Sequence, residues 1–336
     1  MKMKLREIGE FGLIKRVTHN CLVRSEGVFK GIGDDCAVIQ VNPEQLLLVT
    51  TDLLIERTHF KLDWTSPEDL GAKALAVNLS DIAACGGIPR EAFISLAIPE
   101  RVAIEWLDRF YYGMMSLARV HQVNLLGGDT SESKSDLMIN ITLTGIVNRD
   151  DILLRSGACP GDILCLIGTL GESSGGLKLL LSDKMTWTQE EIELIRSHLC
   201  PKPLVKEGRI LAQSGMCDAL IDVSDGLSSD LNHLCEQSHV GAKLFESQLP
   251  ISRNLVKAFG EDKDQIINFV LNGGEDYALL AAIKSEGLVD IKESLKQIGA
   301  DVHVIGKFTS DLKKNFFKMD GTVESLRPQG WDHFKS

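Results

Sequence analysis

Six short segments that pair an acidic residue with glycine, serine or threonine constrain this chain more than any other feature. Most of them follow an apolar run, so their carboxylates are expected at the ends of strands or helices. Carboxylate and hydroxyl oxygens are the ligands that Mg²⁺ prefers, and glycines let a backbone approach a phosphate closely. One such segment is usually a turn or a helix cap, whereas six together predict a metal-assisted phosphate site. The segments are residues 31–35, 50–52, 78–81, 127–130, 222–226 and 273–276.

The order of the expected elements predicts a two-domain protein of mixed strands and helices. A length of 336 residues is enough for two domains of ordinary size. Residues 149–161 contain arginine, glycine and proline without periodicity, so we place the boundary there, between a domain of residues 1–150 and a domain of residues 151–336.

Two local patterns predict particular elements. Ser66, followed by a proline and two acids, is a typical helix start, and the helix is expected to end near Cys85, before two glycines. Residues 136–144 alternate, with Ile139, Ile141 and Leu143 on one face, which predicts a half-buried strand. A further helix is expected from Glu7 to Asn20.

Composition and charge argue against several classes of protein. The net charge of −11, from 36 Lys and Arg against 47 Asp and Glu, is typical neither of nucleic-acid-binding proteins nor of proteins that bind anionic membranes. The eight cysteines contain no C-x-x-C pair, which argues against a zinc ribbon or a redox dithiol. No apolar run reaches the roughly 18 residues of a membrane span. With no secretory signal recognised, we expect a cytoplasmic protein with reduced cysteines.

The common nucleotide-binding signatures are missing from the sequence. There is no G-x-x-x-x-G-K-[ST] loop and no kinase H-R-D or D-F-G motif. Residues 31–36 begin like a dinucleotide fingerprint but carry two acids and a cysteine where a pyrophosphate loop needs glycine. A phosphate site in this chain must therefore be built from its aspartates.

The acidic segments, taken in order, closely resemble those of the thiamine-monophosphate kinases, and the resemblance covers nearly the whole chain. The resembling segments are residues 31–37, 50–52, 73–84, 126–130, 155–158, 221–227, 273–277 and the closing 330–334. This family belongs to a superfamily with aminoimidazole ribonucleotide synthetase and selenophosphate synthetase. The resemblance implies the synthetase-type fold: an α+β N-terminal domain that forms a homodimer through its sheet, and an α/β C-terminal domain. It also implies transfer of phosphate from ATP to thiamine monophosphate, giving thiamine diphosphate, with several Mg²⁺ ions.

The resemblance also assigns site residues. The implied metal ligands are Asp35, Thr50, Thr51, Asp52, Asp81, Asp129, Asp222 and Asp225, of which Asp35 and Asp81 lie closest to the reaction. The implied ATP contacts are Gly128, Asp129, Arg155 and Ser224, and the implied contacts to the thiamine phosphate are His59, Glu275 and Trp331. Asp34 is an additional acid of lower rank, and Tyr112 is a candidate neighbour of the adenine.

Each assignment has a structural alternative. A single histidine such as His59 is usually structural, Trp331 could pin the chain end, and Arg155 could form an interdomain salt bridge. Two other functions also stay open: a different ATP-using synthetase of the superfamily, and a metal-binding protein without catalytic activity. For the kinase, no general base is expected, because the acceptor phosphate, with a second pKa of roughly 6, is already largely ionised.

Overall fold

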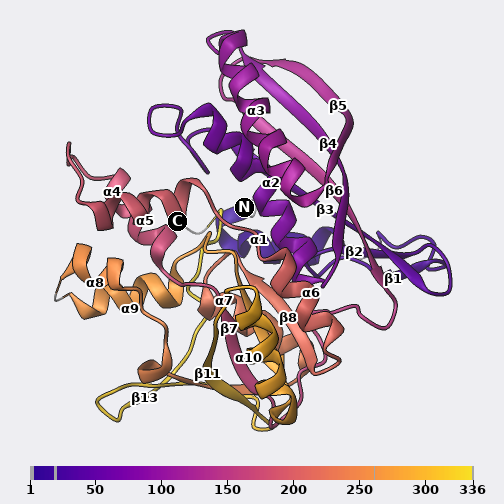
Figure 1. The fold of residues 1–336 in the computed structure, drawn as a ribbon, viewed down its shortest axis with the longest axis vertical. Coiled ribbons are helices and arrows are strands. Elements are labelled where there is room, and N and C mark those ends of the chain that lie inside the picture. The colour runs from indigo at the N-terminus through magenta and orange to yellow at the C-terminus, as the bar shows by residue number, and fades with distance from the viewer. Residues whose placement is uncertain (1–3, 19–20, 261, 335–336) are drawn as a thin grey trace.

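The computed structural model describes residues 4–18, 21–260 and 262–334, which contain two β-sheets with helices between and around them (Figure 1). Both sheets are mixed. In the first, only β4 and β5 pair in parallel, and in the second only β9 and β12 do. The first sheet has the order β1 (Val28–Lys30), β2 (Ala37–Gln40), β3 (Gln45–Ile55), β6 (Met138–Asn148), β4 (Ile88–Pro99), β5 (Asn124–Ser133). The second has the order β13 (Val323–Ser325), β12 (Lys314–Phe317), β9 (Gly241–Phe245), β11 (Val302–Thr309), β7 (Ile163–Ile167), β10 (Ala278–Ile283), β8 (Cys217–Val223).

The helices lie on both sides of the second sheet and on one face of the first. They are α1 (Leu5–Val17), α2 (Pro67–Ala84), α3 (Ile104–His121), α4 (Glu172–Leu180), α5 (Gln189–Leu199), α6 (Val205–Gln213), α7 (Leu227–Ser238), α8 (Arg253–Phe259), α9 (Lys263–Asn272) and α10 (Leu288–Gln297). Two short 3₁₀ turns, Glu246–Gln248 and Ser285–Gly287, complete the described elements. The expected mixed fold is confirmed. The helix expected from Glu7 corresponds to α1, and its expected end at Asn20 lies outside the described residues. No described helix is both long and apolar enough to span a bilayer.

Helix α2 lies at the centre of the molecule, between the two sheets (Figure 1). It begins as predicted, with the Ser66 hydroxyl accepting a hydrogen bond from the Asp69 amide at 3.1 Å. It packs on β3 and β6 on one side and on α6 and β8 on the other, so that almost all of its residues are buried. A helix buried on every side has to be apolar all round. The polar residues that α2 nevertheless carries, among them Lys73 and Asp81, therefore need a specific explanation.

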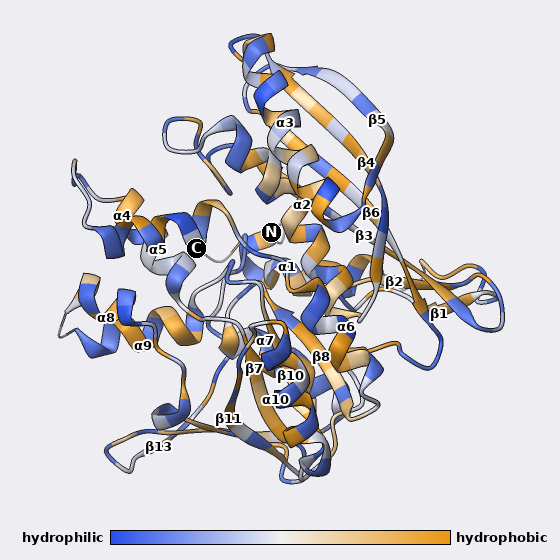
Figure 2. Ribbon diagram, viewed as in Figure 1, coloured by the Kyte–Doolittle hydropathy of each residue, from blue (hydrophilic) through white to orange (hydrophobic). Residues whose placement is uncertain are grey.

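Both faces of the second sheet are covered. One face shares a continuous hydrophobic core with α2 and the first sheet, and the other packs against α7 and α9. Consequently β10 is buried along its whole length, and the hydrophobic colour in Figure 2 runs along β7, β8 and β10. The strands of the two sheets fall on either side of residue 150, while the domain boundary at that position stays a prediction.

The first sheet buries one face and exposes the other. Ile139, Ile141 and Leu143 are buried against α2, as their alternation predicted. On the opposite face Leu53 and Phe93 are 47% and 41% exposed. This exposed sheet face carries large apolar side chains without cover from the described residues.

Three of the acidic segments lie inside regular elements. Residues 50–52 are in the middle of β3, residues 78–81 are in the last turns of α2, and residues 127–130 are in β5. In β5, Gly128 permits close pairing with β4, because a Cβ at this position would lie 1.6 Å from the carbonyl oxygen of Ile94. Its φ of 155° also favours glycine. Pairing with neighbouring strands thus outweighs the local turn preference of glycine and aspartate.

Candidate active site

A cavity of about 1250 Å³ lies where the two sheets, α2 and the C-terminal tail meet. Its walls come from β3, the C-terminal half of α2, the loops that follow β8 and α9, and residues 329–334. Its lining contains one group of carboxylates, called here the carboxylate end, and one group with aromatic side chains, called the aromatic end. We describe the two ends separately.

The carboxylate end is built around Asp35, Asp81 and Asp222, each of which offers an oxygen within 4.8 Å of the others. They come from the loop before β2, from α2 and from β8. Only a few donors serve them: the Thr50 hydroxyl donates to Asp81, and the Ser80 hydroxyl donates to Asp222 at 2.6 Å. We call the three aspartates the acid cluster.

Several buried oxygens at this end accept no hydrogen bond from any residue that the structure describes. They are Asp35 Oδ2, Asp222 Oδ1 and, on the neighbouring strand, Asp52 Oδ2. An unpartnered buried carboxylate oxygen costs free energy unless a ligand satisfies it. An oxygen-only set of this kind fits a hard divalent cation such as Mg²⁺.

The pKa values at this end are raised for the same reason. Burial, followed by repulsion from neighbouring carboxylates, raises the pKa of Asp35 to about 7 and that of Asp222 to about 6. Burial likewise raises the pKa of Asp52 and of Asp225 to about 6, and it raises that of Asp81 well above its usual range. The acid cluster therefore holds less negative charge alone than it would beside a cation.

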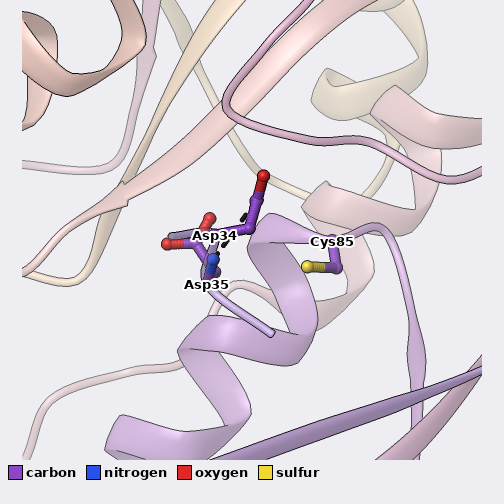
Figure 3. A group of neighbouring side chains, drawn as sticks. All are labelled: Asp34, Asp35 and Cys85. Atoms are coloured by element: carbon purple, nitrogen blue, oxygen red, sulfur yellow. Dashed lines mark hydrogen bonds between the residues drawn. The ribbon is translucent and has the colours of Figure 1, made fainter. Parts of the chain in front are cut away.

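Arg155 is the cation that the chain itself brings to the acid cluster. Its Nε donates to Asp35 Oδ1 at 2.9 Å, while its backbone amide donates to Asp34 Oδ1 at 3.3 Å. The Lys30 ammonium lies 3.1 Å from the Asp34 carboxylate. Figure 3 shows Asp34 and Asp35 beside the end of α2 that carries Cys85. Asp34 thus ties its loop to residue 155, whereas Asp35 keeps one oxygen for the cavity.

The aromatic end contains His59, Glu275 and Trp331. His59 Nδ1 accepts a hydrogen bond from the Ile55 amide at 3.0 Å, so the proton of the neutral ring is on Nε2. Burial lowers the pKa of His59, which keeps the ring neutral. Trp331, 45% exposed, donates from Nε1 to His333 Nδ1 at 3.2 Å. This end offers one imidazole donor, one carboxylate and one large aromatic face.

The C-terminal tail joins the two ends of the cavity. The Trp331 amide donates to the Asp225 carbonyl at 3.0 Å, and the Gly330 amide donates to Ser229 Oγ at 3.0 Å. A Cβ on Gly330 would lie 2.2 Å from the Asp225 carbonyl oxygen, so only glycine permits this contact. The Glu10 amide of α1 donates to Asp332 at 3.2 Å, so the C-terminal tail is tied to α1. The aromatic side chain is thereby fixed relative to the acids.

The cavity brings together most of the residues that the sequence predicted. Those that line it or its acid cluster are Asp35, Thr50, Thr51, Asp52, Asp81, Asp222, Asp225, Arg155, Ser224, His59, Glu275 and Trp331. Their roles stay predictions, but their convergence from distant parts of the chain is a finding.

Three predicted residues lie outside the cavity, and a fourth, Thr51, lines it although its hydroxyl is paired on the exposed sheet face. Strand alternation places the Thr51 hydroxyl on the exposed sheet face, 3.1 Å from the Thr142 hydroxyl. Gly128 and Asp129 are on the edge strand β5, exposed, in register through Ser95 and Asn140 with Leu53. Three strand spacings of about 4.8 Å put Asp129 roughly 14 Å from Leu53. Tyr112 is 67% exposed on α3 and does not line the cavity.

Sequence reasoning assigned no role to three cavity residues, Lys73, His198 and Glu10. His198 and Glu10 line the cavity, and the fully buried Lys73 donates to Glu275. One signal was available for Lys73, which is a charged residue within an otherwise apolar helical run. His198 and Glu10 lie in polar surroundings in the sequence, and no local pattern distinguishes them.

Comparison with known proteins places the chain in a family. The model of the AIR synthase related protein N-terminal domain matches residues 33–147, and that of the C-terminal domain matches residues 159–317. The chain is 37% identical over 329 residues to the thiamine-monophosphate kinase of Bacillus subtilis, which covers 97% of this chain and 99% of that protein. It is 36% identical over 331 residues to the thiamine-monophosphate kinase of Haemophilus influenzae, which covers 98% of both chains. A solved structure of AaThiL complexed with AMPPCP and TMP superposes with a TM-score of 0.86 at 34% identity, covering 99% of each chain. The full-length similarity in sequence and fold shows that the chain is an enzyme of the thiamine-monophosphate kinase family.

Proposed function

We propose that the chain transfers the γ-phosphoryl group of ATP to thiamine monophosphate, giving thiamine diphosphate and ADP. The observation that carries the proposal is the single cavity in which an acid cluster with unpartnered oxygens faces a carboxylate, an imidazole and an indole. The first end suits phosphates accompanied by metal ions, and the second suits a cationic aromatic ring system. The name and bound ligands of the related structure agree with this substrate pair.

The acid end would hold the phosphates of both substrates. Asp35, Asp52, Asp81, Asp222 and Asp225 would bind Mg²⁺, because their oxygens are buried or half-buried and several have no other partner. When bound there, Mg²⁺ would offset the negative charge of the phosphate oxygens. Arg155, already 2.9 Å from Asp35, is placed to turn its guanidinium toward a phosphate. Ser224 adds a hydroxyl at the same end.

The aromatic end would hold the thiamine portion of the acceptor. The indole of Trp331 would stack on its rings, a contact worth on the order of 1–2 kcal/mol. The Nε2–H of His59 would donate a hydrogen bond, and Glu275 would accept one or face the positive charge of the thiazolium. The bonds that pin the tail to Asp225 fix the distance between this group and the acid cluster.

We propose direct in-line transfer, without a general base and without a phosphoenzyme. The attacking oxygen belongs to a phosphate monoester that is already largely ionised at neutral pH. The chain would contribute positioning and a preorganised electrostatic field. Incubation with γ-labelled ATP should leave no label covalently attached to the protein, and a trapped labelled protein would contradict direct transfer.

We also propose that two copies associate through the exposed sheet face. This face combines the apolar side chains of Leu53 and Phe93 with the hydroxyl of Thr51 and with Asp129, a predicted ligand that does not line the cavity of its own chain. A second copy packed there would cover the apolar surface and give these ligands a partner site. Sedimentation of the wild type against Phe93→Asp tests this, and an unchanged monomeric mass for both would contradict the dimer. The cytoplasmic location stays a prediction.

The decisive experiment is an assay of the purified protein with ATP, Mg²⁺ and thiamine monophosphate, following thiamine diphosphate by chromatography. Product that forms only when all three are present supports the proposal. Tight binding of ATP without product would favour the other open function, a synthetase-type reaction with a different acceptor.

A further inference from the structure

Lys73 is the largest fully buried side chain in the described residues, and it is charged. It lies on α2, and its ammonium donates to Glu275 Oε2 at 2.9 Å and to the His198 carbonyl at 3.1 Å. The carbonyl of His198 is in the last turn of α5, where helix carbonyls lack intrahelical partners. One lysine thus connects three separate segments from both halves of the chain at the wall of the cavity.

His198 contacts the same oxygen of Glu275. Its Nδ1 lies 3.2 Å from Glu275 Oε2 and 3.0 Å from the Ser173 hydroxyl. Burial lowers the pKa of His198 to about 3, so the ring is neutral, and its Nδ1 shares a hydrogen bond with the Ser173 hydroxyl. Glu275 Oε2 therefore accepts a hydrogen bond from the Lys73 ammonium and lies against the His198 imidazole.

The other oxygen of Glu275 is left for the cavity. The Glu275 side chain is 23% exposed and lines the cavity, and its Oε1 accepts no hydrogen bond from the part of the chain that the structure describes. The backbone is held in an uncommon conformation, with φ of 63° at Glu275 and 51° at Tyr277. The Glu275 amide donates to the Ser224 carbonyl at 2.7 Å, and the Tyr277 amide donates to the Val223 carbonyl at 2.8 Å. Left-handed non-glycine residues of this kind persist when surrounding contacts fix them, and they concentrate at functional sites.

From this geometry we infer that Lys73 is a positioning residue: with His198 it holds Oε2 of Glu275, so that Oε1 points at the acceptor and binds its cationic or hydrogen-bond-donating rings. A structural ion pair alone would not explain why the same glutamate lines the cavity that His59 and Trp331 also line. The inference rests on the proposed function and deepens it. It states how the chain keeps a carboxylate charged and oriented at the aromatic end.

Steady-state kinetics of four proteins test the inference: the wild type, Lys73→Met, Glu275→Gln and the double variant. Lys73→Met should raise KM for thiamine monophosphate about tenfold or more, the effect of one lost charge-assisted hydrogen bond. The KM for ATP and kcat should stay within about threefold, because the acid cluster is untouched. The double variant should bind the acceptor no worse than Glu275→Gln, because both changes act through one carboxylate.

Two outcomes would overturn the inference. One is a loss in Lys73→Met that affects kcat and both KM values alike, and the other is a double variant whose effect is the product of the single effects. If Lys73→Met fails to fold with its buried carboxylate unpaired, His198→Phe removes the imidazole that lies against Oε2, together with its hydrogen bond to Ser173. That variant should raise the same KM to a smaller extent, and an unchanged KM would also overturn the inference.

A matched control separates positioning from general stabilisation. Lys314 on β12 is also partly buried and donates to Asn232, away from the cavity. Lys314→Met should lower the melting temperature without changing KM for thiamine monophosphate. The wild-type assay tests the proposed function by itself, since absence of thiamine diphosphate there refutes the acceptor before any variant is made. An active wild type with an unaffected Lys73→Met variant refutes only the positioning role.

Discussion

The two ends of the cavity contain buried carboxylates in opposite electrostatic states. In the acid cluster, burial and mutual repulsion raise the pKa values of Asp35, Asp81 and Asp222. At the aromatic end, Glu275 is partly buried, yet its pKa is lowered, because the attraction of the Lys73 ammonium outweighs the cost of burial. The carboxylates of the acid cluster thus have too few cations around them, whereas the carboxylate of Glu275 has a cation of the chain beside it.

This difference indicates how each end would bind its ligand. The acid cluster depends on a cation from outside the chain, so its charge is complete only when the substrate and metal arrive. Glu275 has an internal cation and is ready before the substrate binds, which lowers the cost of organising the site. The first arrangement suits phosphate chemistry that must not begin without metal, and the second suits recognition of an organic ring system.

The largest expected effect comes from removing one member of the acid cluster. Asp81→Asn should lower kcat by about 10³-fold or more, because several kcal/mol of charge stabilisation in the transition state are lost. The fold should survive, since asparagine resembles the protonated aspartate and keeps an acceptor for the Thr50 hydroxyl. Asp183→Asn, on the exposed segment between α4 and α5, serves as the control. Activity of Asp81→Asn close to that of the control would contradict the role given to the cluster.

The second prediction concerns stability against pH. The folded-state pKa values of about 7 for Asp35 and about 6 for Asp222 lie above the ordinary 3.8. At pH values between the unfolded-state and the folded-state pKa, the native state binds more protons than the unfolded state. Without metal, the free energy of unfolding should therefore fall as pH rises from 4 to 7. The change should be on the order of a few kcal/mol.

Melting curves from pH 5 to 8, with EDTA and with excess Mg²⁺, test this second prediction. Mg²⁺ should reverse the trend by binding the ionised carboxylates, so stability should then rise with pH. Glu275 provides the internal comparison, because a lowered pKa contributes stability above about pH 4 that is lost on further acidification. If the melting temperature depends on pH in the same way with EDTA and with Mg²⁺, the claim that the acid cluster needs an external cation is contradicted.

The sequence predicted the fold and the acid cluster because both leave local signals. The cap at Ser66 and the alternation at Ile139, Ile141 and Leu143 depend only on neighbouring residues, and the structure confirms them. The set of aspartates was assigned through the ordered resemblance, and the structure brings most of them to one cavity. Structure that depends on neighbouring residues, and sites that are marked by sequence motifs, can therefore be predicted from the sequence.

Features that depend on pairing between distant segments were not predicted. Residues 127–130 were expected near the end of an element but lie within β5, because pairing with the neighbouring strand β4 decides their conformation. The opposite orientation of Thr50 and Thr51 follows from strand alternation once β3 is known to extend through them. Lys73 and His198 lie 125 positions apart, and nothing in either local sequence indicates that they meet at Glu275.

The smallest expected effect belongs to Trp331, at the rim of the aromatic end. Trp331→Ala should raise KM for thiamine monophosphate by about tenfold, the loss of a ring contact of 1–2 kcal/mol, and should leave kcat nearly unchanged. Trp331→Phe keeps an aromatic face and should recover most of the affinity. Because the tail is held by backbone bonds to Asp225 and Ser229, neither variant should release it. A fall in kcat with unchanged KM would mean that Trp331 acts through the acid cluster and that the two ends are not independent.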